Sequence, residues 1–271
     1  MNSTTVPGAT SDLPKDLFSI AGATALVTGG SRGIGLFVAE GFVRAGVKVY
    51  ISSRDAVACA TVAARLSEQG SCIALPADLS SMEGIARLAN DLGQQVSSLD
   101  ILVNNAGATA NRPIEVLSET EWDDVMDLNV KSTFFLTRSL LPLLRAAGSA
   151  ERPARIVNIG SIAGTKVYDN GGYAYMASKA AVHHLTRALA THLAGQHINV
   201  NAVAPGPMDG GMMQRRIDDP AARSQIEGRI PMARLGDAED LIGVVTFLCA
   251  RASAYLTGTV IPLDGGASTC A

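Results

Sequence analysis

Short apolar runs alternate along the chain with longer stretches in which apolar residues recur every three or four positions. Each run is four to seven residues long, continuous, and bounded by Gly, Pro, Asn or Asp. Continuous apolar runs are typical of strands buried on both faces of a parallel sheet. The pattern predicts strands at Ala23–Thr28, Val47–Ser52, Cys72–Leu75, Ile101–Asn104, Arg155–Ile159, Ile198–Ala204 and Thr259–Leu263.

The stretches between these runs predict helices at Gly33–Arg44, Asp55–Gln69, Ser81–Leu92, Glu119–Leu144, Tyr175–Leu193 and Glu239–Cys249. Strands that alternate with helices form right-handed crossovers. We therefore expect an α/β fold, a doubly wound and mostly parallel seven-stranded sheet of the Rossmann type with helices on both faces. Residues 1–19 are predicted to be a flexible arm and residues 20–271 a single Rossmann-type catalytic domain. Residues 208–233 are polar and Met-rich and break the alternation, as a long irregular insertion that serves as a substrate lid would.

Composition excludes several classes of protein. The 271 residues are 47% hydrophobic and 17% charged, which excludes a mainly disordered chain. The formal charge is -3 and no basic block occurs, so no nucleic-acid partner is expected. No apolar run is long enough to span a membrane, and the first residues lack the basic and apolar segments of a secretory signal. A cytoplasmic location is expected.

The thiols and imidazoles do not form a metal-binding pattern, so no metal is expected. The cysteines are scattered without a CxxC motif and are interpreted as free thiols in a reducing compartment. The histidines crowd one region with no carboxylate between them and are interpreted as part of a helix surface. These histidines are His183, His184, His192 and His197.

A glycine-rich segment, Thr28–Gly35, follows the first predicted strand and opens the first predicted helix. Gly29, Gly33 and Gly35 would let the backbone approach a pyrophosphate and let the helix pack on the strand. A tight structural turn would give the same glycine cluster. The context of strand, turn and helix favours a dinucleotide site over that alternative.

The end of the second predicted strand indicates which dinucleotide is bound. Ser53 lies 20 residues after Gly33, where an acidic residue would bind the ribose hydroxyl of NAD. Ser53 is neutral and Arg54 is cationic, so the pocket suits the additional phosphate of NADP, with Arg32 as a second cation. The alternative is that Arg54 merely pairs with Asp55 on the surface.

A tyrosine and a lysine four residues apart provide candidate acid–base chemistry. Tyr175 and Lys179 share one face of a predicted helix, and the ammonium is expected to lower the pKa of the phenol. Ser161, fourteen residues before Tyr175, follows a strand and would hold a substrate carbonyl oxygen. Tyr173 has Ala177 at the corresponding position and lacks this partner. The alternative is a core tyrosine beside a lysine whose stem alone is buried.

Further motifs accompany the glycine loop, Ser161 and the Tyr175–Lys179 pair. They are Asp78-Leu79, Asn104–Gly107, Asn129, Pro205-Gly206, Thr257-Gly258 and Asp264–Gly266. With these motifs, the chain resembles the short-chain dehydrogenase/reductase family over roughly residues 20–266. The resemblance implies catalytic roles for Asn129, Ser161, Tyr175 and Lys179. Taken with the loop and strand residues above, it implies that NADPH or NADP+ contacts Gly29, Ser31, Arg32, Gly33, Ile34, Gly35, Ser53, Arg54, Asp78, Leu79, Asn105, Ala106, Gly107, Tyr175, Lys179, Pro205, Gly206 and Met208. Two features depart from the family pattern. Gly210 stands where a threonine is common, and the spacing from Ser161 to Tyr175 is one residue longer than usual.

Within the family, the chain resembles 3-oxoacyl-[acyl-carrier-protein] reductases, including those associated with rhamnolipid biosynthesis. The glycine loop Gly30–Gly35, the segment Ser53–Asp55 and the ending Asp264–Gly266 carry the general resemblance. The segments shared with the reductases associated with rhamnolipid biosynthesis are Arg54-Asp55, Cys59-Ala60, Pro76–Ser80, Asn158–Ser161, His197–Asn201 and Ile261–Gly265. The resemblance implies an NADPH-dependent ketoreductase acting on a β-keto thioester or ester, with Tyr175 as proton donor. It also implies a homotetramer, with an acyl carrier protein as a candidate partner.

Two further functions stay open at this point. One is an alcohol, sugar or steroid dehydrogenase, or a carbonyl reductase of broad range, with the same chemistry. The other is a nucleotide-sensing scaffold without catalysis, which the complete set of Asn129, Ser161, Tyr175 and Lys179 argues against.

Overall fold

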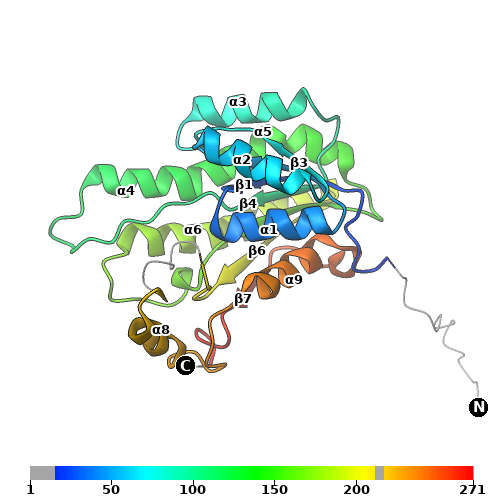
Figure 1. Cartoon of the computed structure of the whole chain (residues 1–271). Helices are drawn as coiled ribbons and strands as arrows, with labels where there is room; N and C mark the ends of the chain where they lie inside the picture. The colour runs from blue at the N-terminus through cyan, green and yellow to red at the C-terminus, as the bar shows by residue number, and fades with distance from the viewer. Residues whose placement is uncertain (1–15, 211–216, 271) are drawn as a thin grey trace, which may run out of the picture.

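The computed structural model describes residues 16–210 and 217–270. Seven parallel strands form one sheet in the order β3-β2-β1-β4-β5-β6-β7, with helices on both sides (Figure 1). The predicted fold class is confirmed, and every predicted strand agrees to within one residue at each end. The strands are β1 Thr24–Thr28, β2 Lys48–Ser52, β3 Ser71–Ala74, β4 Ile101–Asn104, β5 Ala154–Ile159, β6 Ile198–Pro205 and β7 Val260–Leu263.

Polar caps set where several of the helices begin. Asp55 and Ser81 each accept a hydrogen bond from a backbone amide of the helix that follows, and Ser118 and Asp237 form capping boxes with Glu121 and Asp240. The helices are α1 Gly33–Arg44, α2 Ala56–Ser67, α3 Met82–Gly93, α4 Glu119–Met126, α5 Ser132–Ala147, α6 Tyr173–Leu193, α8 Pro220–Glu227 and α9 Ala238–Cys249. The single helix expected over Glu119–Leu144 is wrong in one respect, because a π-helical turn, Asp127–Lys131, separates α4 from α5.

The sheet is covered on both faces, which explains why its strands are continuously apolar. Helices α1, α2 and α9 pack on one face, where Val27 of β1 is buried. Helices α3, α5 and α6 pack on the other face, where the preceding residue, Leu26, is buried. Successive residues of a strand point to opposite faces, so both must be apolar here.

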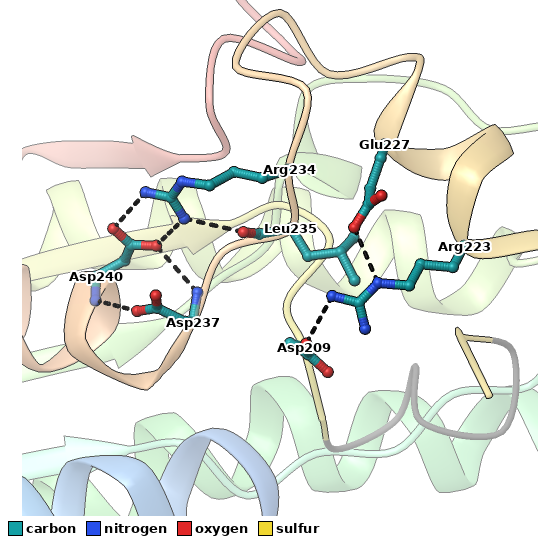
Figure 2. A network of polar contacts seen from close by, with 7 residues as sticks. All are labelled: Asp209, Arg223, Glu227, Arg234, Leu235, Asp237 and Asp240. Atoms are coloured by element: carbon teal, nitrogen blue, oxygen red, sulfur yellow. Dashed lines mark hydrogen bonds and ion pairs between the residues drawn. The ribbon is translucent and has the colours of Figure 1, made fainter. Parts of the chain in front are cut away.

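The segment expected to be an irregular lid is tied down at its base. Met208 pairs with Gly236, and the Asp209 amide donates to the Gly236 carbonyl at 2.7 Å. Figure 2 shows Arg223 of α8 reaching Asp209, while Arg234 grips Asp240 at the start of α9. The expectation of a wholly irregular lid is wrong for α8, which Asp219 caps and which has Pro220 at its first position.

A third apolar cluster lies between this segment and the ends of the strands. It combines Ile162, Ala204, Ile217, Ile230, Leu235 and Ala267, with Tyr168 packed against it. Residues 211–216 of the predicted lid and residues 1–15 of the predicted arm lie outside the described residues. Leu17, within the predicted arm, accepts a backbone hydrogen bond from Ala252 at 2.8 Å. None of the described helices is both long enough and apolar enough to cross a membrane.

Candidate active site

The candidate residues meet at the carboxyl ends of the central strands. The strand order reverses between β1 and β4, and ligands of doubly wound sheets bind in the crevice at such a point. The glycine loop follows β1, Asn105 follows β4 and Ser161 follows β5, while Tyr175 and Lys179 come from α6. The topology therefore brings residues that are far apart in sequence to one edge of the sheet.

The glycine loop has the backbone geometry that a phosphate cradle needs. Gly29 and Gly33 have φ angles of 66° and 54°, a region that favours glycine. A side chain at Gly35 would overlap the carbonyl group of Gly29, so the loop and α1 approach as closely as the backbone allows. The side chain of Arg32 does not cap α1, so the first backbone amides of this helix remain available to an anion.

Hydrogen bonds fix the segment after β4 beside the glycine loop. The Thr28 hydroxyl accepts from the amides of Asn105 and Ala106 at 2.9 and 3.0 Å. In return, Asn105 Nδ2 donates to the Thr28 carbonyl at 2.8 Å. Asn105 and Ala106 therefore lie directly beside the glycine loop, and Gly107 follows them next to Asn129.

The residues assigned to the adenosine end gather after β2 and β3. The Ser53 hydroxyl donates to the Asp55 carbonyl at 3.0 Å, and the Asp55 carboxylate caps α2. Hydrogen bonds from Ser80 lower the pKa of Asp78, and the nearby charge of Arg54 adds to this. Leu79 is buried. Among the ion pairs of the described residues there is none between Arg54 and Asp55, so the alternative surface pair is not formed.

Tyr175 is half-buried at the start of α6, near Ser161. Burial raises the pKa of its phenol, and the hydrogen bond with Ser161 opposes this shift. The expectation that this pKa would be lowered is wrong in its net direction, because burial disfavours the charged phenolate more than Ser161 stabilises it. A phenol with a raised pKa is protonated at neutral pH and is ready to donate.

Lys179 is buried, with only 6% of its surface exposed. Its Nζ donates to the Ile159 carbonyl at 2.8 Å and lies 5.6 Å from the centre of the Tyr175 ring. Burial lowers the pKa of Lys179 to about 8. The contact with Ile159 holds the ammonium between the end of β5 and Tyr175.

Asn129 connects the β4 loop to α6 from the π-helical turn. Its Oδ1 accepts from the Ala108 amide at 2.8 Å, and its Nδ2 donates to the Ala108 carbonyl and to Ser178 Oγ. The Ser178 hydroxyl in turn donates to the Tyr175 carbonyl at 2.7 Å. Sequence reasoning missed Ser178, although a serine one residue before Lys179, on the helix that carries Tyr175, was a signal that could have found it.

A series of buried side-chain hydrogen bonds, which the sequence did not lead us to expect, lies next to the site. Asn104 Nδ2 donates to Asn158 Oδ1 at 2.9 Å, and Asn158 Nδ2 donates to the Thr186 hydroxyl at 2.9 Å. These buried groups join β4, β5 and α6. The signal was an asparagine in each of two apolar strands, since buried amides require partners.

The segment after β6 packs against the end of β7. The Gly206 amide donates to the Leu263 carbonyl at 2.8 Å, and a Cβ at Gly206 would come within 2.7 Å of the Asp264 side chain. Met208, predicted to contact the cofactor, has a buried side chain that belongs to the core shared with α1 and α9. Its side chain is therefore part of the core packing.

The histidine region differs from its predicted surface role at one position. His184, His192 and His197 are exposed, whereas His183 is buried, so the surface interpretation is wrong for His183. Within residues 16–210 and 217–270, no group of three or more His, Cys, Asp or Glu side chains could hold a metal ion. Cys59, Cys72 and Cys249 are buried free thiols, as predicted.

Comparison with known proteins defines the family. A family model described as Enoyl-(Acyl carrier protein) reductase matches residues 29–268. The chain belongs to the short-chain dehydrogenase/reductase family. Members with sequence identity across nearly the whole chain include both reductases of acyl groups and dehydrogenases of sugar acids.

Two curated members and one solved structure illustrate this range. The rhamnolipids biosynthesis 3-oxoacyl-[acyl-carrier-protein] reductase of Pseudomonas aeruginosa is 51% identical over 249 residues, which cover 92% of this chain and 97% of the relative. The gluconate 5-dehydrogenase of Gluconobacter oxydans is 34% identical over 256 residues, 93% of this chain and 96% of that relative. The solved Pseudomonas aeruginosa RhlG/NADP active-site complex superimposes with a TM-score of 0.91 at 50% identity, covering 93% of this chain and 99% of that one.

Proposed function

We propose that this short-chain dehydrogenase/reductase is an NADPH-dependent ketoreductase that reduces the 3-oxo group of an acyl thioester or a related β-keto compound. The observation that carries the proposal is the arrangement at the carboxyl end of β5, where Ser161 lies near Tyr175 and the buried Lys179 Nζ lies 5.6 Å from the centre of the Tyr175 ring. The 51% identity to a 3-oxoacyl-[acyl-carrier-protein] reductase supports the substrate class.

The reaction needs a proton donor where negative charge develops on the carbonyl oxygen. When bound, the nicotinamide cofactor supplies the hydride. Tyr175 gives its proton to the oxygen, and the Ser161 hydroxyl donates a hydrogen bond to the same atom. Lys179 then stabilises the phenolate that Tyr175 leaves, because an adjacent ammonium favours the charged form. Asn129 holds the α6 backbone at Tyr175 through Ser178.

The residues around the cleft fit a phosphorylated dinucleotide. Gly29, Gly33 and Gly35 leave no side chain between the backbone and a pyrophosphate, and the first amides of α1 lack a side-chain cap. Arg54 and Arg32 are exposed cations beside the adenosine end. Since Ser53 is neutral, a 2′-phosphate meets attraction without repulsion, and we propose NADPH as the cofactor.

The relatives favour an acyl chain over a sugar acid as the substrate. The identity is 51% to the 3-oxoacyl-[acyl-carrier-protein] reductase and 34% to the gluconate 5-dehydrogenase. The apolar cluster of Ile162, Ile217, Ile230 and Leu235 is buried and anchors the lid segment on the strands. We propose a 3-oxoacyl thioester carried by an acyl carrier protein as the substrate form.

We place the protein in the cytoplasm as a homotetramer. The buried free thiols fit a reducing compartment, and NADPH-dependent reduction needs the reduced cofactor pool. Large apolar side chains remain exposed on α4, α5 and α6, among them Trp122, Phe134 and Tyr173. Helices that are apolar beyond one face require a further partner, which a second copy of the chain provides.

Oxidation of NADPH by the purified protein tests the proposed reaction. We expect turnover with acetoacetyl and longer 3-oxoacyl thioesters, and little with an enoyl thioester or 5-keto-gluconate. Faster turnover of the keto sugar acid would favour a sugar-acid dehydrogenase instead. Turnover of the enoyl thioester alone would favour the activity in the description of the matching family model.

A further inference from the structure

A buried histidine continues the line of functional side chains along α6. Tyr175, Lys179 and His183 are spaced four residues apart and share one face of the helix. His183 is 3% exposed, although the exposed His184 beside it shows that this part of α6 also reaches the surface. The proposed reaction mechanism does not involve His183.

The imidazole of His183 packs against the turn that carries Ser161. A Cβ placed on Gly160 would lie 2.8 Å from His183 Cδ2, and one placed on Gly164 would lie 2.7 Å from Cε1. Real Cβ atoms do not approach so closely, so neither glycine can be replaced without moving the ring. The turn from Gly160 to Gly164 therefore packs its backbone directly against the imidazole.

A polar contact adds direction to this packing. The Ser161 amide donates to His183 Nε2 at 3.5 Å, while the Gly160 amide donates to the Val203 carbonyl at 2.7 Å. On the other side, Ser161 Oγ accepts from the Ala163 amide at 3.1 Å. His183 thus contacts the backbone of Ser161, while the Ser161 hydroxyl oxygen binds the turn that follows it and lies near Tyr175.

Acceptance by Nε2 requires a neutral ring with its proton on Nδ1. Burial, together with the charges of Lys179 and Arg187 on the same helix, lowers the pKa of His183 to about 4. The groups that the ring meets on the other side, Gly160, Gly164 and the Ser161 amide, carry no charge. The imidazole is therefore an acceptor throughout the neutral range.

We propose that His183 is a positioning residue for Ser161. Its Nε2 holds the Ser161 amide and its ring supports the glycines on either side, which directs the Ser161 hydroxyl toward the carbonyl oxygen of the substrate. This inference rests on the proposed ketoreductase function, because that reaction is what gives Ser161 a substrate oxygen to bind. His183 touches neither substrate nor cofactor and acts through Ser161.

A double-mutant cycle with Ser161 separates positioning from general support of the fold. His183→Leu removes the acceptor, and we expect kcat for a 3-oxoacyl thioester to fall roughly tenfold to a hundredfold, since small misplacements of reacting groups cost about this much. The KM for NADPH should stay within about twofold. His183→Gln, whose amide oxygen can still accept, should recover most of the loss. His184→Leu, at the exposed neighbouring position, is the matched control and should leave kcat unchanged.

The decisive comparison is made in the Ser161→Ala background. If His183 acts through Ser161, His183→Leu should cost less than about twofold once the hydroxyl is gone. The same loss in both backgrounds would overturn the inference. A wild type that turns over no 3-oxoacyl thioester would instead refute the proposed function.

NMR spectra of the histidine side-chain nitrogens, recorded on wild-type protein labelled with 15N-histidine, test the inference in a second way. This measurement requires neither enzymatic turnover nor a variant that must fold. We expect the spectra at pH 7 to show that the His183 imidazole is neutral and carries its proton on Nδ1. A proton on Nε2 at pH 7 would contradict the contact with Ser161 and overturn the inference whatever the enzyme reduces.

Discussion

Burial controls the protonation of the ionisable side chains that follow one another along α6. It raises the pKa of the Tyr175 phenol and lowers the pKa of Lys179 to about 8 and that of His183 to about 4. Along the helix, the protonated phenol is followed one turn later by an ammonium and one further turn later by a neutral imidazole. This order supplies a donor, a stabiliser of the resulting phenolate, and a support for Ser161.

Replacing Tyr175 with Phe should remove the proton donor while keeping the ring that packs in the site. Loss of a general acid typically costs roughly 10²–10⁴-fold in rate, so we expect kcat to fall by that range. Cofactor binding, measured by the fluorescence of bound NADPH, should be unchanged. Tyr173→Phe is the matched control, because Tyr173 is 38% exposed and lacks a lysine four residues later. Near-normal turnover by Tyr175→Phe would remove Tyr175 from this role.

Cofactor choice should depend on Arg54. A charge-assisted hydrogen bond to phosphate contributes on the order of 1.5–3 kcal/mol, which corresponds to about tenfold to a hundredfold in preference for NADPH. Arg54→Ala should weaken the binding of NADPH, seen as a higher KM for NADPH in steady-state kinetics, and should leave the KM for NADH nearly unchanged. Ser53→Asp should go further, since the new carboxylate repels the 2′-phosphate. An unchanged NADPH-to-NADH ratio in Arg54→Ala would shift the assignment to Arg32.

At the scale of an element, helix α6 should make the protein sensitive to acid. The pKa of His183 is lowered in the folded state, so the unfolded chain takes up the proton first as the pH falls. The free energy of unfolding should therefore decrease between about pH 6.5 and pH 4, by about 3 kcal/mol in all. Denaturant titrations should show a smaller decrease for His183→Gln. The exposed His184→Gln should behave like wild type, and identical pH profiles for all of them would contradict the burial of His183.

Local patterns predicted most of the elements. The strands were predictable because both of their faces are buried, and α2 and α3 because Asp55 and Ser81 cap them. The π-helical turn around Asn129 was not predictable, because its side chain bonds to Ala108 and Ser178, which lie far away in sequence. The single stretch of apolar periodicity across Glu119–Leu144 gave no sign of this interruption.

The proximity of the candidate residues was predictable from motifs, whereas their protonation was not. Tyr175, Lys179 and Ser161 were singled out by their spacing and by the strand before Ser161, and the structure brings them close together. The direction of the pKa shift of Tyr175 was mispredicted, because the sequence shows the neighbouring charge and hides the depth of burial. The same limit applies to His183. The crowding of four histidines without a carboxylate suggested a helix surface, although its partners are Gly160, Ser161 and Gly164.

At the scale of the whole molecule, the exposed apolar side chains predict association. Trp122 of α4 and Phe134 of α5 are each 37% exposed, and Tyr173 at the start of α6 is 38% exposed. Light scattering at micromolar concentration should give a mass near four times that of the 28.0 kDa chain. Phe134→Glu should lower this mass, because a carboxylate cannot be buried in an apolar contact without a large cost. A stable wild-type monomer would contradict the proposed tetramer.

The central claim is that the hydride reaches the 3-oxo carbon of an acyl thioester. The most direct test is to incubate the protein with a 3-oxoacyl thioester and NADPH that carries deuterium at C4 of the nicotinamide, and to analyse the product by mass spectrometry. We predict a 3-hydroxyacyl thioester with one deuterium on C3. Recovery of unchanged 3-oxoacyl thioester, while an enoyl thioester or a keto sugar acid takes up the deuterium instead, would contradict the claim.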